Sequence, residues 1–172
     1  MKIEDIILNI ADKLDLDVGR HLYGIIGSYD SLRLFEKEIN GISLSEKSKH
    51  IILSINDGII DSFTNDEFRK IVEEEAKRPE PTKASISKQF ESFMKNLIQK
   101  FDIIVLKDLE LLFIYDIDFS LLRVLATDNK KIVLLLPGKR SLGQVIMYPG
   151  TNQEYRLPQN LIPENHLWEI SN

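Results

Sequence analysis

The spacing of apolar residues changes several times along the chain, and each change predicts the start of a new helix or strand. A helical period over residues 1–18, carried by isoleucines and a leucine, predicts an N-terminal amphipathic helix. The most regular helical stripe in the chain runs from Ile86 to Phe101. Shorter stripes predict a helix capped by Ser31, a charged helix from Phe68 to Lys77 and a short helix from Leu121 to Leu125.

Between these helices lie short, continuous apolar runs, which are typical of strands buried on both faces. They are Leu22 to Ile26, Ile51 to Ile55, Ile103 to Leu106 and Ile132 to Leu136. A polar hairpin and a last strand from His166 to Ile170 are expected within residues 141–172. Strands that alternate with helices predict an α/β fold, namely a three-layer sandwich around a mainly parallel sheet of about five strands. The third and fourth runs are expected to lie inside that sheet.

The breaks between runs suggest the organisation of the chain. Its 172 residues fit a single domain over 1–172. The second strand is expected to stop at Asn56-Asp57-Gly58. Pro79 and Pro81 are expected to break the charged helix and to place an internal loop at residues 78–84. That loop and the charged helix beside it are predicted to meet a protein partner, because they project from the expected sheet.

Composition narrows the class of protein. The net charge is −5, and basic residues are interleaved with acids, so no direct nucleic-acid partner is expected. The chain has no cysteine, which excludes disulfides and thiolate metal sites and fits a reducing compartment. No apolar run approaches the roughly 20 residues of a membrane span. These features predict a cytoplasmic protein with no membrane partner.

The end of the first strand carries the clearest chemical motif. Residues Gly24 to Ser31 lie in register with the phosphate-binding loop G-x-x-x-x-G-K-[ST], which makes Gly24, Gly27, Ser28 and Ser31 candidate nucleotide-binding residues. Tyr29 replaces the last glycine of the motif, and Asp30 replaces its lysine. A tyrosine side chain crowds the turn and an aspartate repels a triphosphate, so tight nucleotide binding is not expected. The other interpretation is a plain strand–turn–helix junction with a chance pair of glycines.

Acidic residues follow other predicted strands. Asp108, with Glu110 second, follows the run from Ile103 and resembles the Walker B acid that holds Mg²⁺. If nucleotide binds, Ser31 and Asp108 are the expected Mg²⁺ contacts. A carboxylate metal site of Asp30, Asp57 and Asp108 is an alternative, but their spacing does not require it, and a solvated rim of acids is the favoured interpretation. No triad or nucleophile elbow is present in the sequence, so no catalytic residue and no resident metal or cofactor is predicted.

Two further sets of polar residues are predicted by position. Lys139 and Arg140 follow Pro137-Gly138, which is expected to be a tight turn, and they are candidate contacts for a partner. His21, His50 and His166 each precede or open a strand, so they are expected at the sheet edge opposite the candidate ligand site. A structural metal there is an alternative to ordinary packed histidines.

Three segments carry a family resemblance. The stretch Phe101 to Leu106, then Leu111-Leu112-Phe113, then Ile132 to Gly138 resembles the small accessory proteins of BREX phage-defence systems, of the BrxB and BrxF types. The final stretch, with Tyr155-Arg156-Leu157 and Leu167 to Ile170, is similar too. The resemblance covers roughly residues 20–170 and supplies no catalytic residues. It implies a role in antiviral defence beside larger ATPase, methyltransferase and phosphatase-like proteins, and the BrxF type implies a P-loop-containing fold.

The sequence thus leaves three functional hypotheses. The first is a non-catalytic protein-interaction subunit of a BREX-like system, built on a degenerate NTPase fold. The second is an ATP/Mg-binding protein or weak ATPase with an atypical loop. The third is a metal-dependent nuclease that uses the acids at the strand ends.

Overall fold

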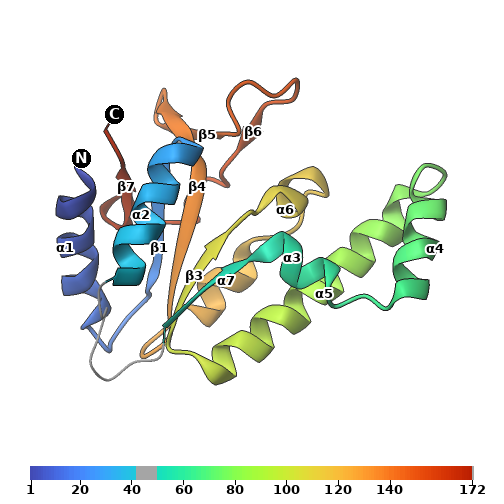
Figure 1. Cartoon of the computed structure of the whole chain (residues 1–172), viewed down its shortest axis with the longest axis horizontal. Helices are drawn as coiled ribbons and strands as arrows, with labels where there is room; N and C mark the ends of the chain where they lie inside the picture. Colours follow the sequence, from blue (N-terminus) through green and yellow to red (C-terminus); the bar gives the residue numbers. More distant parts are fainter. Residues whose placement is uncertain (42–49, 172) are drawn as a thin grey trace.

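A mainly parallel sheet forms the centre of the computed structural model, which describes residues 1–41 and 50–171. Its parallel strands are β1 (Leu22–Gly27), β2 (His50–Ser54), β3 (Ile103–Lys107), β4 (Lys131–Ser141) and β7 (Leu167–Glu169). They lie in the order β2-β3-β4-β1-β7 (Figure 1). The predicted third and fourth strands, β3 and β4, are both interior, which confirms the expectation. The second strand, β2, is an edge strand, and its residues are only half-buried.

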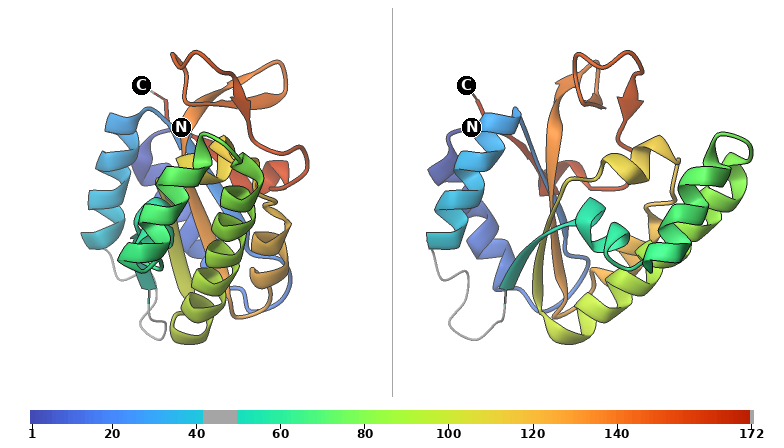
Figure 2. Two further views of the ribbon diagram at one scale, coloured as in Figure 1. Left: turned by 90° about the vertical axis from the view of Figure 1, so that its right-hand side faces the viewer. Right: turned by 45° about the vertical axis from the view of Figure 1, so that its right-hand side comes forward.

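Helices cover both faces of this sheet, as Figure 2 shows. One face is covered by α1 (Ile3–Leu14) and α2 (Tyr29–Gly41), and the other by α3 (Ile55–Ile60), α5 (Pro79–Lys100), α6 (Glu110–Ile114) and α7 (Ser120–Leu125). Along β4, Ile132, Leu134 and Leu136 pack in one core, whereas Val133 and Leu135 pack in the other. Successive strand residues face opposite sides, so a run that is apolar throughout must be covered twice. The predicted three-layer α/β class is confirmed.

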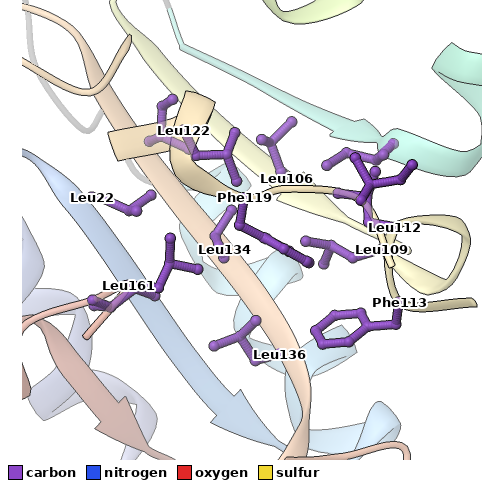
Figure 3. Close-up of a cluster of buried hydrophobic side chains, with 14 of the residues drawn as sticks. Leu22, Leu106, Leu109, Leu112, Phe113, Phe119, Leu122, Leu134, Leu136 and Leu161 are labelled. Carbon is purple, nitrogen blue, oxygen red and sulfur yellow. The ribbon is translucent and has the colours of Figure 1, made fainter. Parts of the chain in front are cut away.

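The larger core lies beneath α3, α5, α6 and α7 (Figure 3). Leu106, Leu134 and Leu136 of the sheet meet Leu112 of α6 and Leu122 of α7, and all five are fully buried. The smaller core joins α1 and α2 to the other face, with Phe35 and Tyr23 at its centre. Burial of leucine side chains contributes roughly 1.5–3 kcal/mol each, so these two cores hold the layers together.

Two predicted breaks are helix starts instead. The loop expected at residues 78–84 is wrong, because α5 begins at Pro79. The first N–H groups of a helix have no intrahelical acceptor, so Pro79 and Pro81 fit the first turn without the loss of a helical hydrogen bond. The expected stop at Asn56-Asp57-Gly58 forms the first turn of α3, where the Ser54 Oγ accepts from the Asp57 backbone N–H at 3.1 Å. The charged helix is confirmed as α4 (Asn65–Glu75).

A second correction concerns Pro137 to Arg140, which are not a turn. The strand β4 continues through them to Ser141, where it pairs antiparallel with β5 (Gln144–Met147). β5 in turn pairs with β6 (Tyr155–Arg156), so the predicted polar hairpin is present. The 3-10 turn η1 (Glu164–His166) then leads into β7.

The strand that contains Gly24 and Gly27, β1, and the strand before Asp108, β3, flank β4. Because all three are parallel, their carboxyl ends bring the motif and the acid to the same edge of the sheet. The two segments therefore lie at the edge where parallel sheets usually bind their ligands.

Candidate functional site

The candidate phosphate-binding segment does not form a loop. Gly24 to Gly27 belong to β1 and Tyr29 begins α2, so Ser28 alone joins strand to helix. The Ser28 Oγ accepts from the Ser31 N–H at 3.2 Å, and the Ser28 carbonyl accepts from the Leu32 N–H at 2.9 Å. Ser28, rather than the predicted Ser31, therefore caps the helix. Phosphate-binding loops wrap the phosphates in backbone N–H groups of an extended turn, and a one-residue junction has no such turn.

Both glycines of the motif are explained by packing. A Cβ on Gly24 would lie 2.6 Å from Leu167 Cδ1 and 2.8 Å from Ile162 Cδ1. A Cβ on Gly27 would lie 2.5 Å from Ser31 Oγ. The glycines therefore let β7 and the first turn of α2 approach β1 closely, and this role requires no ligand.

The substituted positions of the motif contact protein groups. Tyr29 is half-exposed, and its hydroxyl donates to Glu110 Oε1 at 3.2 Å. Partial burial, with the neighbouring Glu110 carboxylate second, raises the pKa of Tyr29 to about 12. Asp30 faces solvent and lies 3.9 Å from the Arg33 guanidinium. At physiological pH the phenol is neutral and Asp30 repels anions, so neither residue attracts a phosphate.

Glu110, rather than Asp108, is the central carboxylate of this edge. Its Oε2 accepts from Asn56 Nδ2 at 2.8 Å, and Asn56 Oδ1 accepts from the Leu111 N–H at 3.1 Å. Together with the Tyr29 bond, these contacts tie α2, α3 and α6 to one another. Asp108 adopts a left-handed backbone with φ of 53°, and its carbonyl accepts from the Asn56 N–H at 3.1 Å. The sequence ranked Glu110 second and gave Asn56 no role, although its position directly after the predicted second strand was the available signal.

A small hollow lies beside Asp108, with a volume of about 150 Å³. Its lining is mixed in charge: Tyr29, Leu32, Arg33, Glu36, Lys107, Asp108, Leu135 and Pro137. The Lys107 ammonium is already paired with Glu36 at 2.8 Å. Ligand pockets usually measure about 300–1,000 Å³, so this hollow is too small to enclose a nucleotide.

An aromatic cluster brings the C-terminal hairpin onto the same edge. Tyr148 packs edge-on against Phe113 and Tyr155, with ring centroids 5.5 and 6.1 Å away. Its hydroxyl is buried and has no hydrogen-bond partner among the described residues. Burial, with Glu110 and Tyr29 next, holds the pKa of Tyr148 far above its ordinary value. The sequence did not predict this residue, because its burial depends on contacts with α6.

The predicted acidic metal site is not assembled. Asp30 and Asp57 lie in the first turns of α2 and α3, while Asp108 follows β3. Within residues 1–41 and 50–171, no three histidine or carboxylate side chains are grouped so as to hold a metal ion.

The histidines divide between two places. His21 and His166 gather around Tyr23 at the amino edge of the sheet: His21 Nδ1 lies 2.8 Å from the Tyr23 hydroxyl, and the His166 ring centroid lies 4.7 Å from the tyrosine ring. His50 opens β2, which is separated from β1 by β3 and β4.

The two predicted contact surfaces differ in character. Arg140 is structural, because it forms ion pairs with Glu164 and Glu169 and donates to the Leu167 carbonyl at 2.8 Å. Lys139 next to it is exposed. Pro79 and Pro81 are exposed in the first turn of α5, beside α4.

Comparisons with known proteins add little to this geometry. No protein-family model matches the chain, and no curated protein matches it either. Among solved structures, the crystal structure of a DNA replication initiation factor aligns over 76% of this chain and 36% of that chain, at 18% identity and a TM-score of 0.36. The chain therefore spans little more than a third of that protein, and so distant a likeness carries no argument about function. No helix of the described residues is long and apolar enough to cross a membrane.

Proposed function

We propose that the chain is a non-catalytic protein-interaction subunit of a BREX-like antiviral defence system, built on a degenerate NTPase fold. One observation carries the proposal: a single residue, Ser28, joins β1 to α2 where a working NTPase needs a phosphate-binding loop. The Ser28 and Ser31 hydroxyls bond to each other at 3.1 Å, so their hydrogen bonds are made within the chain.

The assignment to a defence system rests on the sequence resemblance. The resembling segments form β3, α6 and β4, which are structural parts of the fold. The partners are therefore proposed as other proteins of such a system, of the phosphatase-like or ATPase kind. A subunit without its own chemistry contributes by binding them.

The ATP/Mg hypothesis is the second candidate, because Asp108 and Ser31 do reach the same edge of the sheet. Thermal unfolding with ATP and Mg²⁺, and with Mn²⁺ alone, separates the two. A ligand at about 100 times its Kd adds about 2.7 kcal/mol, which for a chain of this size raises Tm by roughly 5–11 °C. We expect no such rise.

Two results would change the conclusion. A rise in Tm with ATP that disappears in Ser31→Ala or Asp108→Ala would replace the proposal with an ATP-binding function. A rise with Mn²⁺ alone would favour the nuclease hypothesis. The positive test is co-purification of the tagged chain with the proteins encoded beside it, and recovery of none of them would contradict the interaction role.

A further inference from the structure

The helix α4 is amphipathic but buries none of its residues. Phe68, Ile71 and Val72 recur at helical spacing, yet Phe68 is 44% exposed and Val72 is 57% exposed. A surface helix normally buries its apolar stripe against a core. Along the described chain, α4 is the α-helix that does not.

Few contacts hold α4 in place. It lies along the first part of α5, and the pair extends beyond the edge of the sheet (Figures 1 and 2). Ile71 lines the groove between the two helices with Pro81 and Thr82. At the far end, Glu75 accepts a hydrogen bond from the hydroxyl of Tyr115, the residue directly after α6. The Phe68–Val72 face is turned away from this groove by the helical spacing and remains open to solvent.

The start of α4 is nevertheless well defined. Thr64 and Glu67 form a capping box in which each side chain accepts from the backbone N–H of the other. Such a box stabilises a helix end by about 0.5–2 kcal/mol. The helix is thus preformed without burial of its apolar face, and a preformed face lowers the entropic cost of binding.

The segment that carries this face is acidic as a whole. Residues 55–75, which cover α3, its connection and α4, carry seven carboxylates and two basic side chains. All seven carboxylates are exposed, and none forms an ion pair among the described residues: Asp57, Asp61, Asp66, Glu67, Glu73, Glu74 and Glu75. An acidic surface attracts a basic partner and repels a second copy of itself or an anionic membrane.

We propose that α4 is a docking helix whose Phe68–Val72 face, carried by this acidic segment, binds a basic amphipathic segment of a partner protein. This inference rests on the proposed interaction function and names the chemistry of the partner. Apolar residues of the partner segment cover Phe68 and Val72, as in helix-in-groove recognition, while its Lys and Arg side chains are attracted to the carboxylates of α3 and α4. The carboxylates set the orientation and the rate of encounter, and the apolar pair supplies most of the affinity.

A labelled synthetic peptide tests the proposal by fluorescence anisotropy. The probe is an amphipathic Leu/Lys helix of about five turns, roughly 18 residues. Its controls are a Leu/Glu peptide of the same pattern and a Leu/Lys peptide in scrambled order. We expect the Leu/Lys helix to bind best at about 50 mM salt and to weaken as salt rises, because exposed charges are then screened.

The protein variants are matched. Phe68→Gln/Val72→Gln removes the apolar face with a residue that favours helix, and it should weaken binding about 30-fold. Leu8→Gln/Val18→Gln changes two side chains that are 67% and 85% exposed elsewhere, and it should change Kd less than about twofold. Both variants should keep the wild-type Tm, because these side chains are exposed.

Three outcomes with the purified protein would overturn the inference, and a fourth comes from co-purification. One is equal binding of the scrambled peptide, which means that charge alone acts. Another is unchanged binding to Phe68→Gln/Val72→Gln. A third is a concentration-dependent dimer, seen by sedimentation, that this variant loses, which assigns the face to a second copy. If proteins encoded beside the chain co-purify equally with wild type and this variant, the interaction function stands and the α4 assignment falls. If wild type recovers none of them, the proposed function itself fails.

Discussion

Replacement of Gly27 by alanine tests whether this glycine serves packing or phosphate binding. The new Cβ would lie 2.5 Å from Ser31 Oγ, whereas its next neighbours, on Ile170 and Leu32, lie at ordinary distances of 3.4 and 3.5 Å. The clash is therefore with one hydroxyl. Relief requires Ser31 to rotate and to give up two hydrogen bonds, to the Ser28 carbonyl at 3.0 Å and from the Ser28 hydroxyl at 3.1 Å.

The expected magnitudes follow from these contacts. Two lost hydrogen bonds cost about 2 kcal/mol, because each contributes about 1 kcal/mol net. Alanine in place of glycine within a strand recovers about 0.5–1 kcal/mol. Gly27→Ala should thus lower the free energy of unfolding by about 1–1.5 kcal/mol, or Tm by roughly 2–6 °C. In a Ser31→Ala background, where the hydroxyl is absent, the same change should stabilise by about 0.5–1 kcal/mol.

Urea unfolding of the four proteins in this double-mutant cycle measures the coupling, which should be about 2 kcal/mol. Trp168, the single tryptophan, is buried opposite Ile25 of β1 and reports on this region. An equal cost of Gly27→Ala in both backgrounds would refute the packing explanation. A loss of ATP-induced stabilisation in Gly27→Ala would instead support a phosphate-binding role.

Three further predictions follow from other contacts. Arg140→Ala should destabilise the protein by about 1–2 kcal/mol in urea unfolding, because it removes ion pairs and a hydrogen bond that hold the segment around β7. The control Lys139→Ala, at the exposed neighbour, should change stability by less than about 0.5 kcal/mol, and equal effects of the two variants would contradict the prediction. Burial is the largest cause that lowers the pKa of His21 and of His166, so both are harder to protonate in the folded protein. Their contribution to the free energy of unfolding should be fully present above about pH 6.5 and should be lost as pH falls through the lowered folded-state pKa values. His21→Gln should reduce this dependence on pH, and an unchanged slope would count against the prediction. Glu110→Ala should cost about 1–2 kcal/mol, measured as a lower urea midpoint, because two hydrogen-bond donors lose their acceptor, and a wild-type midpoint would exclude the network.

The pattern of the sequence determined the elements and their class. Continuous apolar runs such as Ile132 to Leu136 require cover on both faces, which only a sheet between two helical layers supplies. The stripe from Ile86 likewise predicted the long helix, although α5 begins seven residues earlier at Pro79. A proline that begins a helix and a proline that ends one cannot be told apart from the proline alone. The difference is whether the helix lies after the proline or before it.

Tertiary contacts decided the character of the candidate site. Gly24 and Gly27 matched a phosphate-binding spacing, but their neighbours include Leu167, Ile162 and Ile170, which lie more than a hundred residues away. Arg140 was predicted to lie in a turn from its sequence neighbours. In the structure it belongs to the part of β4 that pairs with β5, and its guanidinium contacts Glu164 and the Leu167 carbonyl. A local pattern of apolar residues shows whether a segment is helix or strand, because the two differ in the spacing at which side chains share a face. The pattern does not show which distant side chains pack against a glycine. At this junction those distant side chains account for the glycines without a phosphate-binding loop.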